Sequence, residues 1–114
     1  MSDDTKAAPD ATILDRLYDI IEARRGADKT SSYTAQLLAE GVPKIAQKFG
    51  EEAVETLIAS TTQDNAALAA ESADLLYHLA VLWAAKGIRP ADVWQILADR
   101  EGVSGLAEKA ARET

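Results

Sequence analysis

Four acidic side chains in the middle of the chain have the types and spacing of a metal site. Glu52 and Glu55 stand three residues apart in "EEAVE", and Glu71 and Asp74 stand three residues apart in "ESADLLYHL". On a helix this spacing places both carboxylates of a pair on one face. The second pair lies in an otherwise apolar stretch, where an acidic side chain needs a partner because it is almost never buried alone. A divalent cation would neutralise both charges and keep them ionised.

Oxygen is the only ligand atom that these four side chains offer, and the chain has no cysteine. Oxygen ligands favour Mg²⁺, with Mn²⁺ as a possible substitute. Because Mg²⁺ commonly shares its coordination shell with substrate phosphates, the implied reaction is attack of water on a polyphosphate.

Simpler explanations exist for the same residues. An acidic pair such as the one in "EEAVE" is most often a solvated helix face, and Glu71 and Asp74 could instead form ion pairs with Lys44, Lys48 or an arginine. The only histidine, His78, is expected to be a hydrogen-bonded core residue rather than a metal ligand.

Two long helices must position the acids, and the apolar spacing predicts an all-α chain of about five helices. The predicted helices span residues 13–23, 33–40, 43–61, 66–86 and 90–100, with a short, weaker helix from Ser104. Candidate start and stop residues support these bounds. They are Asp10 or Thr12, Ser31 or Ser32, Gly26, Gly41, Pro43, Gly87, Pro90 and Gly102. Residues 1–11 are expected to be a flexible tail and residues 12–114 a single domain.

The helix predicted at 66–86 is apolar in most directions, which is typical of a buried helix. A chain of 114 residues can hardly cover that helix on all sides, so we expect a helical bundle completed by dimerisation.

Charge and composition exclude several classes of partner. The formal net charge is -7 and no basic stripe is present, so neither nucleic acid nor an anionic membrane surface is an expected partner. We find no signal peptide and no apolar run long enough to span a membrane. The absence of cysteine is compatible with a reducing compartment, and we expect a cytoplasmic protein.

Three segments resemble the phosphoribosyl-ATP pyrophosphatase family: "SYTAQLL" at 32–38, "KIAQKFGEEAVE" at 44–55 and "ESADLLYHLAVLWAAKGI" at 71–88. The resemblance covers about residues 13–100 and extends more loosely to the all-α, MazG-like nucleotide pyrophosphohydrolases. It implies the second step of L-histidine biosynthesis, Mg²⁺-dependent hydrolysis of phosphoribosyl-ATP to phosphoribosyl-AMP and pyrophosphate. It also implies a homodimer or higher homo-oligomer in which helices of two subunits form one bundle.

The resemblance assigns roles to individual side chains. The implied metal ligands are Glu52, Glu55, Glu71 and Asp74. Glu51 completes the family's EExxE motif and is expected to position or deprotonate water, so the implied catalytic residues are Glu51 and Glu52. Lys48 is an expected phosphate contact and Lys44 a weaker one. Tyr33 lies in the "SYT" signature and is expected to bind substrate, without a defined role.

Two other functions are compatible with the sequence. A house-cleaning pyrophosphatase for dUTP, dCTP or damaged nucleotides would use the same metal site. A non-catalytic acidic helical adaptor would carry solvated or salt-bridged acids, and its stability would not respond to Mg²⁺. Many relatives carry a fused cyclohydrolase domain with cysteine-bound zinc. Because this chain is short and lacks cysteine, we expect it to perform the pyrophosphatase step only.

Overall fold

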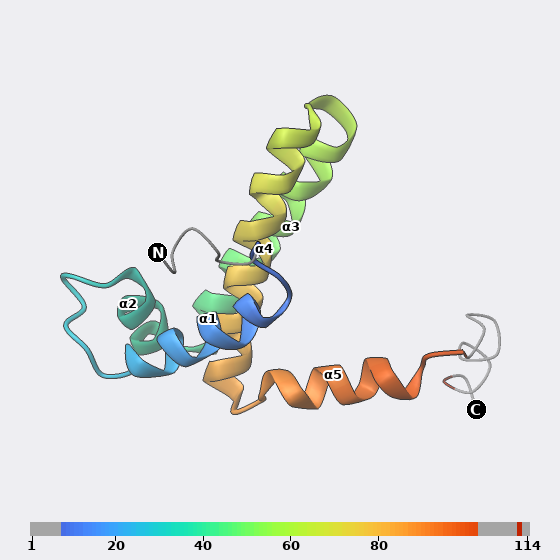
Figure 1. Cartoon of the computed structure of the whole chain (residues 1–114). Coiled ribbons are helices and arrows are strands. Elements are labelled where there is room, and N and C mark those ends of the chain that lie inside the picture. The colour runs from blue at the N-terminus through green and yellow to red at the C-terminus, as the bar shows by residue number, and fades with distance from the viewer. Residues whose placement is uncertain (1–7, 103–111, 113–114) are drawn as a thin grey trace, which may run out of the picture.

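The computed structural model describes residues 8–102 and residue 112, and all regular structure in this part of the chain is helical (Figure 1). The helices are α1 (Thr12–Ala23), α2 (Tyr33–Glu40), α3 (Val42–Thr62), α4 (Asn65–Lys86) and α5 (Pro90–Asp99). The predicted all-α class and the five predicted helices are therefore confirmed. The helix predicted from Ser104 and most of the predicted N-terminal tail lie outside the described residues.

Local sequence signals explain where these helices begin and end. The side chain of Ser32 accepts a hydrogen bond from the backbone N–H of Ala35 at 3.1 Å and so caps α2. Asp64 does the same for α4 through the N–H of Ala67 at 2.8 Å. Gly87, at φ 76°, stops α4 in a left-handed conformation that favours glycine. Helix α5 ends at Asp99, slightly before the predicted end, and a turn leads from it to Gly102.

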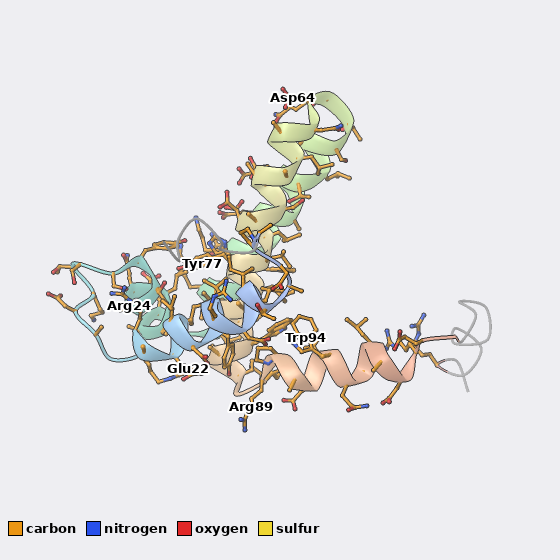
Figure 2. All side chains as sticks on the ribbon, viewed as in Figure 1. Glu22, Arg24, Asp64, Tyr77, Arg89 and Trp94 are labelled. Atoms are coloured by element: carbon orange, nitrogen blue, oxygen red, sulfur yellow. The ribbon has the colours of Figure 1, made fainter. Side chains whose placement is uncertain are left out.

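Helices α3 and α4 form a long antiparallel hairpin, and the other helices gather around its base (Figure 1). Asp64 lies at the tip of the hairpin, far from this base (Figure 2). The core lies at the base and draws on α1, α2, the start of α3 and the second half of α4. Its buried members are Tyr18, Ile21, Leu37, Ile45, Ala80, Val81, Trp83 and Ala84. The upper half of the hairpin thus projects beyond the main core.

Helix α5 runs away from the hairpin and is held at its start by Trp94 (Figures 1 and 2). The Trp94 ring meets the Trp83 ring edge-to-face, with centroids 6.0 Å apart, and its Nε1 donates to Asp15 Oδ1 at 3.3 Å. The radius of gyration is 16.9 Å, whereas a compact domain of this size has about 13 Å. The chain by itself is therefore an open arrangement of helices.

Burial of α4 differs between its two halves. Ala80, Val81 and Ala84 in the second half are buried, but Ala69, Ala70 and Ala73 in the first half are exposed. Within one chain the expected burial of this helix is therefore met only in part of its second half, because Leu76, where that half begins, is 43% exposed. The rest of α4 leaves apolar side chains exposed, which agrees with the expectation that one chain alone cannot cover this helix.

None of the five described helices combines the length and apolarity that a membrane-spanning segment requires.

Candidate metal site

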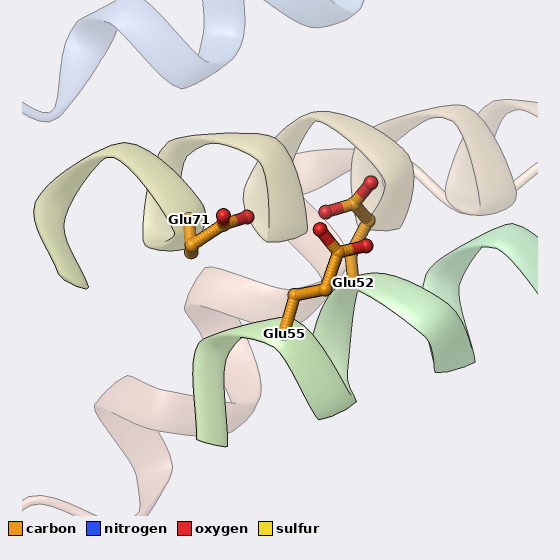
Figure 3. Close-up of side chains that lie close together, drawn as sticks. All are labelled: Glu52, Glu55 and Glu71. Atoms are coloured by element: carbon orange, nitrogen blue, oxygen red, sulfur yellow. The ribbon is translucent and has the colours of Figure 1, made fainter. Parts of the chain in front are cut away.

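Three carboxylates converge between α3 and α4 (Figure 3). Glu52 and Glu55 project from α3 and Glu71 projects from α4, and one oxygen of each lies within 4.8 Å of the others. The two helices pack closely along the hairpin, so side chains 16 to 19 residues apart in sequence meet in space. Three of the four predicted ligands are thus brought together.

The position of Glu52 follows from the face of α3 that is buried. Ile45 and Ala59 stand seven residues before and after it, and both are buried. Seven residues are close to two helical turns, so Glu52 shares their face and turns towards α4. Its carboxylate is placed there by the apolar residues on either side of it.

Thr56 fastens the two helices beside the carboxylates. Its Oγ1 lies 2.8 Å from the carbonyl oxygen of Glu52 and 3.3 Å from that of Glu71, so the hydroxyl donates across the interface. The sequence analysis did not identify Thr56. The sequence did offer a signal, because Thr56 stands four positions after Glu52. Small hydroxyl side chains on a helix bond the carbonyl oxygen one turn earlier.

Two of the carboxylate oxygens are buried without a hydrogen-bond partner within the part of the chain that the structure describes. Glu52 Oε2 and Glu71 Oε1 are buried and accept no hydrogen bond from the described residues. Burial raises the pKa of Glu52, and the charges of Glu55 and Asp74 raise it further. Leaving carboxylate oxygens buried and unpaired is costly, and a bound cation would remove that cost.

Ion pairs do not supply that cation in the described part of the chain. The ion pairs found there join Arg25 to Glu22 and Lys48 to Glu51, and neither reaches Glu71 or Asp74. The competing explanation that Glu71 and Asp74 form structural salt bridges therefore has no support from the described residues. All three convergent groups offer oxygen, which fits a hard divalent ion.

Asp74 is exposed and is not among the three converging carboxylates. Its charge raises the pKa of Glu52, as a nearby carboxylate does. It stands almost one turn after Glu71 on α4, where a helix places its side chain next along the same face. That Asp74 completes the ligand set stays a prediction.

Glu51 is not one of the three converging carboxylates. Its carboxylate accepts hydrogen bonds from Gln47 Nε2 at 3.0 Å and from Lys48 Nζ at 3.2 Å. These bonds, from Gln47 first and from Lys48 second, lower the pKa of Glu51. Glu51 holds the ammonium group of Lys48 in place, and Lys44 lies exposed one turn earlier. The expected roles of these residues towards water and phosphate stay predictions.

His78 links α4 to the first turn of α2. It is buried, its Nδ1 lies 2.8 Å from the carbonyl oxygen of Asp74, and its Nε2 lies 3.2 Å from the hydroxyl of Tyr33. Because a carbonyl only accepts, Nδ1 donates to Asp74, and Nε2 is the nitrogen that meets the Tyr33 hydroxyl. The expectation of a hydrogen-bonded core histidine is confirmed. Beside it, Thr34 Oγ1 and the Tyr77 hydroxyl form a second link, at 2.5 Å, that the sequence analysis missed.

Comparison with known proteins gives consistent matches over most of the chain. A family model described as phosphoribosyl-ATP pyrophosphohydrolase matches residues 14–101. A phosphoribosyl-ATP pyrophosphatase of Azospirillum brasilense is 62% identical over 104 residues, which cover 91% of this chain and 94% of that protein. One of Parvibaculum lavamentivorans is 62% identical over 105 residues, covering 92% and 96%. One of Paramagnetospirillum magneticum is 55% identical over 105 residues, covering 92% and 96%.

Proposed function

The chain belongs to the phosphoribosyl-ATP pyrophosphohydrolase family, and we propose that it hydrolyses phosphoribosyl-ATP to phosphoribosyl-AMP and pyrophosphate in histidine biosynthesis. The adaptor alternative is set aside, because relatives that are 62% identical over nine tenths of the chain carry the name of a pyrophosphatase. The proposal includes a cytoplasmic location and a small-molecule nucleotide as the ligand.

The observation that carries the proposal is the pair of buried, unpaired oxygens on Glu52 and Glu71. Together with Glu55 they would hold Mg²⁺, with Asp74 as the fourth ligand, and Mn²⁺ is the expected substitute. When bound, the ion supplies positive charge that offsets the acidic protein and polarises the phosphate oxygens.

The residues of the chain then have distinct tasks in the hydrolysis. A carboxylate orients a water molecule and takes up its proton: either Glu52 in the cluster or Glu51, its neighbour in sequence. The water oxygen forms a bond to the α-phosphorus, the bond from that phosphorus to the α–β bridging oxygen breaks, and pyrophosphate leaves with the bridging oxygen. Lys48, held beside the cluster by Glu51, stabilises the charge of the phosphates, and Lys44 lies close enough along α3 to assist.

A second copy of the chain is part of the proposal. Val54, Leu57 and Ile58 on α3 are exposed by 55%, 63% and 45%, which is unfavourable for such large apolar side chains. An apolar hollow of about 230 Å³ between α1 and α4 also lies open. Its walls are formed by Ile13, Leu14, Leu17, Ala73 and Leu76. A homodimer that buries these surfaces would complete the helical bundle and cover the first half of α4.

The test is release of pyrophosphate from a panel of nucleotides in the presence of Mg²⁺. We expect phosphoribosyl-ATP to be preferred over dUTP and dCTP, and the gene to restore growth of a histidine auxotroph. Glu71→Gln and Asp74→Asn should abolish turnover while circular dichroism stays unchanged. Glu101→Gln, the same kind of change in an exposed turn after α5, should leave turnover intact.

Two results would contradict different parts of the proposal. Faster hydrolysis of dUTP or dCTP than of phosphoribosyl-ATP would refute the substrate but leave the metal site standing. Near wild-type rates in both Glu71→Gln and Asp74→Asn would refute the site. Sizing with light scattering tests the dimer separately, and a monomer at the assay concentration would refute that part.

A further inference from the structure

Tyr33 presents an aromatic ring whose position is fixed on several sides. Its ring lies 6.3 Å from the Tyr77 ring at an interplanar angle of 24°, and 6.0 Å from the His78 ring at 74°. Its hydroxyl bonds to His78 Nε2 at 3.2 Å. Even so, 47% of Tyr33 remains exposed. The polar end of the side chain is therefore bonded to His78, while about half of the residue stays open to solvent.

This ring lies at the edge of the carboxylate cluster. His78, which holds the Tyr33 hydroxyl, bonds with its other nitrogen to the carbonyl oxygen of Asp74 at 2.8 Å. From the other side, the charges of Lys48 and Glu52 both act on the Tyr33 hydroxyl, whose pKa is raised mainly by burial. Tyr33 is thus linked through His78 to the backbone of Asp74 and lies within electrostatic reach of Lys48 and Glu52.

We propose that the ring of Tyr33 is the wall against which the adenine of the substrate stacks. The inference rests on the proposed function, because hydrolysis at the α-phosphorus places that phosphorus at the carboxylates. The base is then one ribose away, at the edge of the cluster. A flat π surface held rigid at that edge suits a purine, since stacking on an aromatic ring needs no hydrogen bond from the side chain. Tyr77 and His78 act as its support.

Kinetics of Tyr33 variants with phosphoribosyl-ATP and Mg²⁺ test the inference. Tyr33→Leu removes the ring, and KM should rise about tenfold or more while kcat changes less than about twofold, because a contact made equally in ground and transition state is lost. Tyr33→Phe keeps the ring and should stay within about threefold of wild type in KM. Ile20→Ala is the control, since it trims an apolar side chain on α1 that is exposed by 54%.

A second measurement on the wild-type protein covers the case in which Tyr33→Leu does not fold. Nuclear Overhauser effects between H2 or H8 of AMP and tyrosine ring protons, in the presence of Mg²⁺, should appear and should persist in Tyr33→Phe as effects to phenylalanine ring protons. Their absence at saturating AMP overturns the inference. So does an unchanged KM in a folded Tyr33→Leu protein, or a change in its oligomeric state on a sizing column, which would assign the ring to a subunit contact.

Failure of the proposed function has a different signature. Wild-type protein would then release no pyrophosphate from phosphoribosyl-ATP, whereas the contact between AMP and Tyr33 is measured without turnover. Loss of the contact in an active enzyme counts against the role of Tyr33 alone.

Discussion

Replacing Glu71 by glutamine should make the metal-free protein more stable and make it less responsive to metal. One carboxylate oxygen of Glu71 lies within 4.8 Å of one oxygen of Glu52 and one oxygen of Glu55. At that separation two ionised carboxylates repel each other by about 0.9 kcal/mol in bulk water and by about 3.5 kcal/mol at the effective dielectric constant of a protein site. Because one group can hold a proton and Glu55 is exposed, we expect relief of about 1–2 kcal/mol.

Thermal unfolding followed by circular dichroism measures this relief. A free-energy change of about 1 kcal/mol shifts Tm by about 4 °C in a domain of this size, so in EDTA at pH 7.5 Glu71→Gln should melt about 4–8 °C above wild type. In Mg²⁺ the difference in Tm between Glu71→Gln and wild type should become smaller or change sign. A site with a dissociation constant of about 1 mM stabilises the wild type by about 1.4 kcal/mol at about 10 mM Mg²⁺, and the variant should gain far less.

Glu101→Gln is the matched control, because the same chemical change there removes a charge far along the chain from the cluster. Its Tm should follow that of wild type in both conditions. A lower Tm for Glu71→Gln than for wild type in EDTA would mean that Glu71 is paired in the metal-free protein, and the reasoning from buried, unpaired oxygens would be refuted.

Three further predictions follow from the structure. Lys48→Ala should lower kcat/KM for phosphoribosyl-ATP by about 10- to 100-fold, since a hydrogen bond to a charged group is lost, and equal rates would remove Lys48 from the site. Ile45→Ala empties a fully buried position and should cost about 2–5 kcal/mol in urea unfolding, and a cost below about 1 kcal/mol would contradict the described core. In EDTA the stability of the wild type should fall as pH rises from the ordinary Glu value of 4.5 through the raised pKa of Glu52, because the native state then holds the extra proton. Glu52→Gln should flatten that part of the pH–stability curve, and an unchanged slope would contradict the raised pKa.

Local signals made most of the fold predictable. Ser32, Gly87 and Pro90 act within one or two turns of their own position, so the helix ends they mark could be read without knowledge of the tertiary structure. The meeting of Glu52 with Glu71 was also predictable, because two long helices joined by a short turn must lie side by side.

What the sequence did not reveal depends on the orientation of side chains between elements. The bond from Thr56 to the carbonyl of Glu71 and the link between Thr34 and Tyr77 join helices whose rotation about their axes is set by packing. Glu51 and Glu52 both stand about one helical turn before Glu55, so both are suitably spaced to share a metal ion with it. Only Glu52, however, shares the buried face of Ile45. Periodicity places Glu52 on the face of Ile45, but it does not show that this face meets Glu71 on the neighbouring helix.

The predicted ion-holding acids all come from one hairpin, within 23 consecutive residues, whereas Tyr33 belongs to a separate short helix that merely leans on it. The hairpin and the helix of Tyr33 can therefore diverge in sequence at different rates. If Tyr33 stacks on the base as proposed, a homologue that differs around "SYT" would keep the four acids and prefer another base. If the proposed roles hold, the residues that cleave the phosphoric anhydride and the residue that contacts the base lie on different helices.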